Sequence, residues 1–227
     1  MGRRIGGKGG GSDPGPGKKT GRVVAAAALA GVVGVTSGTV SLGGSAAIEG
    51  AVADSGANAV AGRGLNSRKA DSKRSAGRGR PDEAWQRLGL RGMRKTAKRD
   101  ASCLIHSHGE IREFFLRTPC TSLDRQLLAI GDGNGNTALV SVVWVSFRSR
   151  GQARDFERLE KIHGNGDITP LAASLIQMAD VRFTAHHFDS RLAGNTVVIA
   201  ESERATGQVS DAVLDALAEV AVHLPRA

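Results

Sequence analysis

The sequence predicts an α+β domain at residues 101–227, a four-stranded antiparallel sheet with helices packed on one face. Two observations carry this fold class. Apolar segments of strand length come in two adjacent pairs, and an amphipathic helical pattern follows each pair. A further helix is expected before the first pair, which gives the order α-β-β-α-β-β-α. One transmembrane helix and a disordered linker are expected to precede this domain.

The first unit begins with a helix and continues with a strand pair. Ser107 and Glu110 have the spacing of a capping box, which predicts a helix at residues 108–117. Residues 126–130 and 137–147 are predicted strands, and the sequence GDGNGN between them is typical of a turn. The second strand is apolar at nearly every position, so we expect it to be central in the sheet.

The second unit repeats this arrangement. The sequence SRGQ, which begins at Ser149, is another capping-box pattern and predicts a helix at residues 150–162. Residues 181–188 and 195–201 are then predicted to form a second hairpin, because turn-forming residues separate them. The apolar positions of residues 211–224 recur with helical spacing, which predicts the last helix.

A weakly apolar segment at residues 23–44 predicts where the chain works. Its 22 residues are enough to cross a bilayer, and basic residues precede it, whereas residues 45–62 contain none. The positive-inside rule therefore places the amino terminus in the cytoplasm and the carboxy-terminal domain outside the cell. We expect a single-pass protein of the cell membrane in which residues 1–22 form a disordered basic tail.

Two other interpretations of residues 23–44 stay open. Val23–Val35, followed by small residues at 44–47, also fits a signal peptide that is cleaved. The many glycine and hydroxyl residues fit an Ala/Gly-rich disordered stretch in a soluble protein as well. The signal anchor is the prediction, because both the length of the segment and its flanking charges fit it.

The basic character of the chain belongs to its first half. Residues 1–100 have a net charge of +12, whereas residues 101–227 have one of −3. Residues 45–100 are rich in Gly, Ala, Ser, Arg and Lys, with Trp85 as the single aromatic residue, which predicts a disordered linker. Within it, residues 82–99 fit either a short basic amphipathic helix, for a lipid surface or for the domain, or a frayed linker.

The two cysteines, Cys103 and Cys120, bracket the predicted first helix. An even number of cysteines in an exported domain favours a disulfide. Closing the loop between them would stabilise the fold by roughly 3 kcal/mol. In a cytosolic chain, the same two residues would instead be buried free thiols.

The segment around the cysteines resembles a known group of proteins. It comprises Cys103, the sequence HSHGEI from His106, the pair Phe114–Phe115, and Pro119–Cys120, with residues 143–145 and 163–166 further on. In these features the chain is similar to uncharacterised actinobacterial single-span envelope proteins. Those proteins have a short cytoplasmic segment, one apolar span and an exported domain. The resemblance implies an envelope location and a disulfide, but no activity.

Histidines are the candidate metal ligands, because exported metal sites use His and Asp. The candidates are His106, His108, His186, His187 and Asp189. Adjacent His186 and His187 would point to opposite faces of a strand, so only one of them would join His108. Histidines that face solvent or are hydrogen-bonded explain the pattern better. We therefore predict no metal site and no cofactor.

The sequence contains no nucleophile motif of the GxSxG, SxxK or Cys–His type. Ser107, Ser149 and Ser210 are interpreted as helix caps. The turn at residues 131–136 resembles the start of a calcium loop, but no glutamate stands at the twelfth position. No catalytic and no cofactor-binding residue is therefore predicted.

A nucleic-acid interaction is the third hypothesis, and it rests on the basic segment at residues 63–99. Within it, the sequence RGRP from Arg78 matches the core of an AT-hook. Asp82 and Glu83 follow, where such a hook has further basic residues. The segment would also lie outside the cell in an exported protein. Nucleic acid is therefore not an expected partner.

Together these observations predict a membrane-anchored extracytoplasmic binding domain and favour binding over catalysis. Its ligand would be an extracytoplasmic partner or a component of the cell envelope. The first alternative is an exported metal-dependent hydrolase that uses the histidine pairs. The second is a cytosolic nucleic-acid-associated protein.

Overall fold

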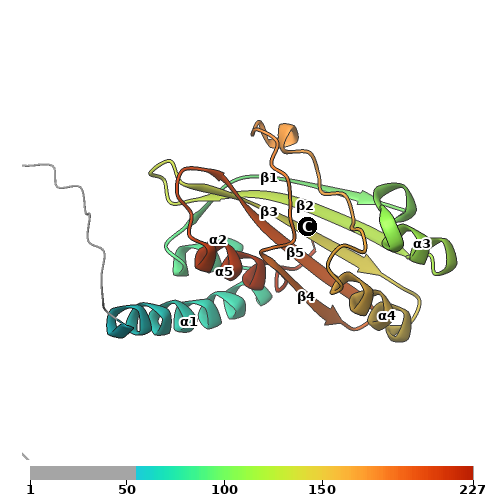
Figure 1. The fold of residues 1–227 in the computed structure, drawn as a ribbon, viewed down its shortest axis with the longest axis horizontal. Coiled ribbons are helices and arrows are strands. Elements are labelled where there is room, and N and C mark those ends of the chain that lie inside the picture. The colour runs from blue at the N-terminus through green and yellow to red at the C-terminus, as the bar shows by residue number, and fades with distance from the viewer. Residues whose placement is uncertain (1–54, 227) are drawn as a thin grey trace, which may run out of the picture. The chain divides into compact units, whose positions relative to one another are not determined.

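Residues 55–226 are described by the computed structural model, with side chains from Gly64 onward. A five-stranded antiparallel sheet lies at the centre, in the strand order β1-β2-β3-β5-β4 (Figure 1). The strands are β1 (Arg91–Asp100), β2 (Ser122–Gly131), β3 (Thr137–Ser146), β4 (Phe188–Ala193) and β5 (Thr196–Thr206). The α-helices are α1 (Ser55–Gly77), α2 (Pro81–Arg87), α3 (Gly109–Arg117), α4 (Arg150–Glu160) and α5 (Asp211–Ala221). Two short 3-10 helices are η1 (Leu104–His106) and η2 (Ala173–Ile176).

Strand β3 is central, as its apolar sequence predicted. All 10 of its residues are buried, and it pairs with β2 on one side and β5 on the other. Val140 and Val142 point to one face of the sheet, whereas Val143 and Val145 point to the other. A strand that buries apolar side chains on both faces needs a covering layer on each face.

Helices cover both faces of the sheet, so the predicted single helical layer is wrong. On the first face, Trp85 of α2 and Leu217 of α5 share one apolar cluster with the sheet. On the second face, Phe115 of α3 and Phe156 of α4 cover one end. The segment that contains η2 covers the other end, where Ile176 is buried. Figure 1 shows α1, α2 and α5 grouped apart from α3 and α4.

The predicted count of four strands is also wrong, because β1 adds a fifth strand at the edge of the sheet. β1 pairs with β2 along its whole length, from Arg91 opposite Gly131 to Asp100 opposite Leu123. Its sequence, RGMRKTAKRD, has no alternation of apolar and polar residues, and most of the strand is exposed. An edge strand that buries so little surface lacks the pattern by which a strand is predicted.

The predicted disordered linker at residues 45–100 is wrong for its described part, because residues 55–100 form α1, α2 and β1. The single aromatic residue of this part, Trp85, is only 1% exposed. It packs in the same cluster as Ala76 and Leu88, against α5 and the sheet. The composition predicted disorder because apolar residues are few, but these few converge on one surface.

Ion pairs add to the contact between α1 and α5. The Lys69 and Lys73 ammonium groups lie 2.7 and 2.5 Å from the two carboxylate oxygens of Glu219. Burial raises the pKa of Glu219, but the hydrogen bonds from the two lysines outweigh it, so that the pKa is lowered. Lys69 and Lys73 thus connect α1 to α5 within the folded domain and do not belong to a separate tether.

The amphipathic helix considered for residues 82–99 ends early. α2 stops at Arg87, and Gly89 adopts a φ of 80° before the chain enters β1. A left-handed glycine after the last turn is a common helix stop. Only the first part of the predicted segment is therefore helical.

No helix within residues 55–226 is long and apolar enough to cross a membrane. The segment predicted to do so, residues 23–44, lies outside the described residues, as does the tail at residues 1–22. In the described chain, α1, α2 and β1 occupy the part of the predicted linker from residue 55 onward.

The second hairpin begins later than predicted. Residues 181–187 form no strand, and β4 begins only at Phe188. Gly194 and Asn195 form the turn between β4 and β5, and Gly194 has the positive φ of 66° that tight hairpin turns favour. The residues at 189–194, predicted as the turn, therefore lie mostly in β4.

One of the two predicted capping boxes is present. Ser149 caps α4, with both hydrogen bonds of the box in place. The box at Ser107 is wrong, because its Oγ donates to the Leu104 carbonyl and its backbone pairs with Ile168 in a β-bridge. Ser210 precedes α5, but its side chain makes no capping hydrogen bond.

The predicted disulfide between Cys103 and Cys120 is present, with Cα atoms 6.1 Å apart. It closes a loop that contains η1 and α3, and Cys103 is buried. Four aromatic rings pack together in the same part of the core: Phe114, Phe115, Phe147 and Phe156. The bond therefore closes the loop that carries α3, and the apolar side chains of α3 pack on the second face of the sheet.

Replacing both cysteines by alanine should lower the free energy of unfolding by about 3 kcal/mol, because the unfolded chain is no longer cross-linked. Urea denaturation of the oxidised protein and of the double variant measures this difference. A reducing agent should bring the wild type to the stability of the variant and leave the variant unchanged. Equal stability of the wild type with and without reductant would contradict a stabilising cross-link.

Candidate ligand-binding cleft

A cleft of about 640 Å³ opens on the sheet face that α3 and α4 cover. Its walls come from the start of α3, the turn that follows α4, and the segment that leads into β4. This segment runs across the sheet before β4 begins (Figure 1). β5 contributes Glu201. The titratable side chains that line the cleft are His108, Glu160, Lys161, His163, Asp167, Arg182, Asp189 and Glu201.

Direct backbone contact fixes the turn after α4 against the start of α3. Gly109 and Gly166 have φ values of 62° and 101°, which other residues rarely adopt. A Cβ atom on Gly166 would collide with the His108 carbonyl oxygen. The His108 amide donates to the Asp167 carbonyl at 3.0 Å. These contacts fix the positions of His108 and Asp167 in the wall of the cleft.

Three carboxyl groups with low solvent exposure line this cleft: Glu160, Asp167 and Glu201. Glu201 is 5% exposed, and its Oε2 accepts a hydrogen bond from the Ala185 amide at 3.1 Å. Its carboxyl also shares a hydrogen bond with Asp167. The Oε1 atom of Glu160 is closed to solvent and has no hydrogen-bond partner in the described chain. The cleft therefore contains a buried carboxyl oxygen without a donor, Glu160 Oε1, and a pair of carboxyls that share a proton, Asp167 and Glu201.

Burial raises the pKa of all three carboxyl groups. The pKa of Glu201 rises to about 9, first through burial and then through the nearby charge of Asp167. Burial also raises the pKa of Asp167, against the hydrogen bonds that this side chain accepts. For Glu160, burial raises the pKa well above its usual value, and the charges of the other two add to it. At neutral pH, Glu201 and Asp167 therefore share a proton between their two carboxyl groups.

Basic side chains stand at the open side of the same cleft. Lys161, His163 and Arg182 are exposed lining residues. Lys161 pairs with Glu157 at 3.1 Å, whereas Arg182 has neither a hydrogen bond nor an ion pair within residues 55–226. Apolar side chains complete the walls: Ile162, Phe183 and Phe188. The cleft thus combines buried acids, exposed bases and apolar walls.

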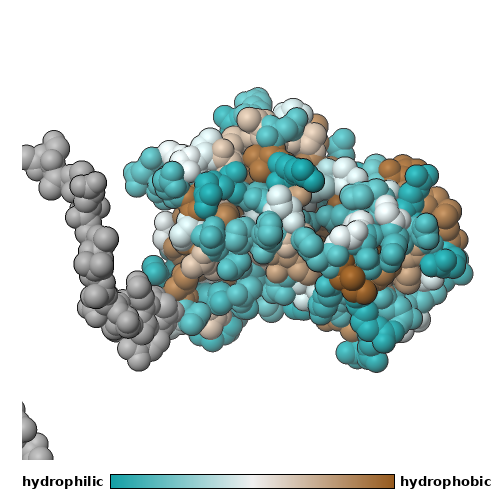
Figure 2. Space-filling view, in the orientation of Figure 1, coloured by the Kyte–Doolittle hydropathy of each residue, from teal (hydrophilic) through white to brown (hydrophobic). Residues whose placement is uncertain are grey.

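Apolar surface offers no competing site on the face shown in Figure 2. Hydrophilic side chains dominate that face, and apolar ones occur in small, separate patches. The exposed large apolar residues of the described chain also lie on different elements: Met93, Ile105, Leu116, Ile162 and Leu175. Isolated apolar residues at a surface are ordinary in soluble proteins. The cleft is the stronger candidate.

The candidate metal ligands do not converge. His108 and Asp189 line the cleft. His106 Nε2 lies 3.1 Å from Asp100 Oδ1, outside the cleft, and the His186 ring lies tilted near that of His163, with ring centroids 6.1 Å apart. Within residues 55–226, no three His, Cys, Asp or Glu side chains are arranged to hold a metal ion.

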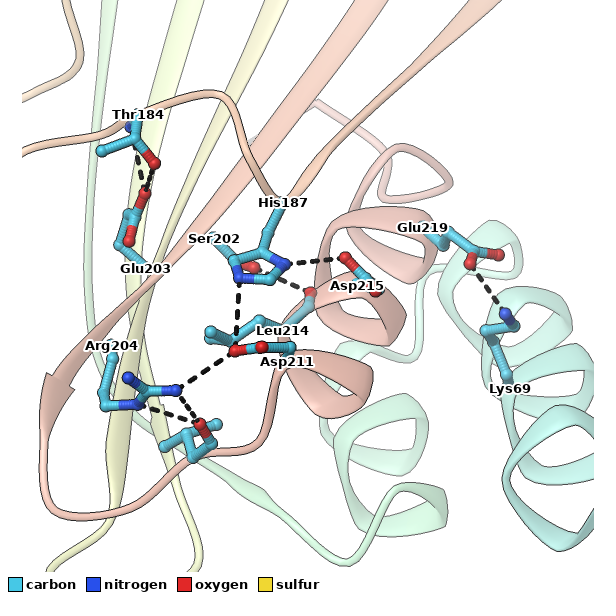
Figure 3. A network of polar contacts seen from close by, with 11 residues as sticks. Lys69, Thr184, His187, Ser202, Glu203, Arg204, Asp211, Leu214, Asp215 and Glu219 are labelled. Carbon is cyan, nitrogen blue, oxygen red and sulfur yellow. Dashed lines mark hydrogen bonds and ion pairs between the residues drawn. The ribbon is translucent and has the colours of Figure 1, made fainter. Parts of the chain in front are cut away.

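His187 belongs to a separate polar network, which connects the segment before β4 to α5 (Figure 3). Its Nδ1 lies 2.7 Å from Asp215, and its Nε2 lies 3.7 Å from Asp211, which also accepts from Arg204. Ser202 lies close by, but it is 1% exposed and its Oγ donates to a helix carbonyl at 2.7 Å. A serine that is buried and bonded in this way is not a nucleophile.

The acidic residues of the cleft were not predicted as site residues. Glu160 ends α4, Asp167 follows the turn after that helix, and Glu201 continues the apolar run of β5. One signal was present, since a carboxylate within a buried strand is rare unless it is paired. No local pattern linked the three positions.

No protein-family model, curated protein or solved structure matches this chain. The resemblance to actinobacterial envelope proteins therefore stays a prediction.

Replacing Glu201 by glutamine should stabilise the domain at alkaline pH. A carboxyl whose pKa is raised in the folded state binds its proton more tightly there, so its contribution is full below pH 4.5 and declines towards pH 9. The free energy of unfolding should fall by up to about 1.4 kcal/mol per pH unit in this window. Glutamine keeps a hydrogen-bond donor and does not ionise, so the slope should become shallower.

Urea denaturation between pH 5 and pH 9 measures this slope. The exposed Glu113 of α3 provides the control, because Glu113→Gln leaves the cleft intact and should keep the wild-type slope. Identical slopes for the wild type and for Glu201→Gln would contradict a protonated carboxyl in the folded state.

Proposed function

We propose that this chain is an extracytoplasmic binding domain whose acidic cleft holds an organic cation. The observation that carries the proposal is Glu160 Oε1, a buried acceptor without a donor, beside the hydrogen-bonded carboxyls of Asp167 and Glu201. Leaving such an acceptor unpaired costs on the order of 1–3 kcal/mol. A ligand that brings N–H donors into the cleft would recover this free energy.

The chemistry of the cleft favours an ammonium group over a metal ion. A metal ion needs several ligands at fixed distances, and no such set exists within the described residues. An ammonium group carries three donors on a compact charge, and carboxylates are its usual partners. The apolar side chains of Phe183 and Phe188 would contact the carbon chain to which the ammonium group is attached.

An extracytoplasmic location is part of the proposal. The disulfide between Cys103 and Cys120 supports it, because such bonds persist in oxidising compartments. The basic residues before residue 23, and their absence from residues 45–62, support it as well.

The alternative functions find less support. The histidines that a metal-dependent hydrolase would use are distributed between the cleft and other contacts, as described above. The segment proposed for nucleic acid is folded into α1, α2 and β1 from residue 55 onward. In its AT-hook core, Pro81 begins α2, and Arg80 pairs with Glu83 at 2.7 Å. An AT-hook lies extended in the minor groove, so this conformation does not favour it.

Titration calorimetry with hexylamine tests the proposal. The wild type should bind the ammonium form, and Glu160→Gln should weaken binding by about ten-fold or more, since a charge-assisted hydrogen bond contributes about 1.5–3 kcal/mol. Glu113→Gln, an exposed change outside the cleft, should bind like the wild type. 1-Hexanol has the same carbon chain without the charge and should not bind. Equal binding by Glu160→Gln, or no binding of hexylamine at millimolar concentration, would contradict the proposal.

The affinity for hexylamine should rise with pH. Glu160 and Glu201 must lose their protons to pair with the cation, and burial raises the pKa of both, that of Glu201 to about 9, so binding should strengthen from pH 6 to pH 9. An alkylammonium group stays charged in this range, as lysine does with a pKa of about 10.4. The other charged or titratable groups that face the cleft are His108, Glu160, Lys161, His163, Asp167, Arg182 and Asp189.

The variant Glu201→Gln isolates the contribution of Glu201 to this pH dependence. Its affinity should rise less between pH 6 and pH 9 than that of the wild type, because one of the carboxyls with a raised pKa is removed. The same calorimetric titration, repeated at each pH, measures both profiles. A wild-type affinity that stops rising at pH 7 would exclude Glu201 as the group that loses the proton.

A further inference from the structure

The cleft has two chemically different parts, which constrain the ligand beyond its positive charge. Glu160, Asp167 and Glu201 form the buried acidic part. At the exposed part, Arg182 has a guanidinium group without a carboxylate partner in the described chain. A ligand that offered only an ammonium group would leave this guanidinium unused.

Arg182 differs from the other exposed bases of the cleft. Lys161 is already paired with Glu157 at 3.1 Å, and an imidazole ring lacks the planar fork of donors that a guanidinium group has. A guanidinium group is always charged and presents its N–H donors as a planar fork. Two parallel hydrogen bonds from this fork match the two oxygens of a carboxylate.

The size and the walls of the cleft fit a ligand with two ends. A volume of about 640 Å³ lies within the range of small-molecule sites, roughly 300–1,000 Å³. Such a volume exceeds that of one ammonium group alone. The apolar side chains of Ile162, Phe183 and Phe188 line the same space and offer contact to an aliphatic chain.

We propose that the ligand is a zwitterion, with an ammonium group bound by the buried carboxyls and a carboxylate bound by Arg182. Its chemical class is that of amino acids, or of short peptides, whose amine and carboxylate are joined by an aliphatic chain. This inference rests on the proposed function, because it assigns the amine to the same carboxyls. It adds a second subsite, which the cation proposal does not require.

Three probes with the same six-carbon chain test the second subsite by titration calorimetry: 6-aminohexanoate, hexylamine and hexanoate. The wild type should bind 6-aminohexanoate up to about five-fold more tightly than hexylamine, since an ion pair with an exposed arginine contributes up to about 1 kcal/mol. Hexanoate should bind most weakly, because the buried carboxyls repel it or leave it without a donor.

Variants of Arg182 test whether this side chain causes the difference in affinity between 6-aminohexanoate and hexylamine. Arg182→Gln should lower the affinity for 6-aminohexanoate to that for hexylamine and leave the affinity for hexylamine unchanged. Arg182→Lys should recover part of the loss, because it keeps the charge but not the planar fork. Arg148→Gln is the matched control, since Arg148 is an exposed arginine that does not line the cleft. Thermal melting of each variant verifies that it is folded.

The outcomes separate the two proposals. Equal affinities for 6-aminohexanoate and hexylamine, or an equal loss of both in Arg182→Gln, would overturn the carboxylate subsite and leave the cation site in place. Failure of both amines to bind the wild type would overturn the cation site, and the carboxylate subsite with it.

Discussion

Strand β3 is buried on both of its faces, and this constraint determines the layers around it. Each face presents apolar side chains, so each needs its own cover. On the first face, α1, α2 and α5 come from the two ends of the described chain and form one cover. On the second face, α3, α4 and the segment around η2 form a cover of separate pieces. The cleft lies among these pieces, over Glu201 of β5.

The parts of the fold that were predicted from the sequence have strong local signals. The continuous apolar run of β3 indicated a central strand, and the box at Ser149 indicated the start of α4. The even number of cysteines in a domain expected to be exported indicated the disulfide. β1 has no such signal, because an exposed edge strand needs few apolar residues. Trp85 of α2 packs in the same apolar cluster as residues of α5. The amino-acid composition of the segment does not predict this long-range contact.

The cleft was not predictable from local patterns, because its acids come from three separate parts of the chain. Glu201 reaches it through the register of the sheet, in which it lies opposite Ser141. Its neighbour in sequence, Ser202, points to the other face and donates to the Leu214 carbonyl of α5. A shift of one residue in this register would exchange the two side chains. Site and fold thus depend on the same strand pairing.

Strand β1 also determines how the sheet ends. Within residues 55–226 its outer edge is unpaired, and five of its ten residues are lysine or arginine. An unpaired edge offers backbone groups on which a second chain can add as a strand. Two copies that met along this edge would bring their cationic side chains face to face. The lysine and arginine residues of β1 are the reason that its sequence does not resemble a strand. Their mutual repulsion also opposes the pairing of two β1 edges, and therefore aggregation of the folded domain through this edge.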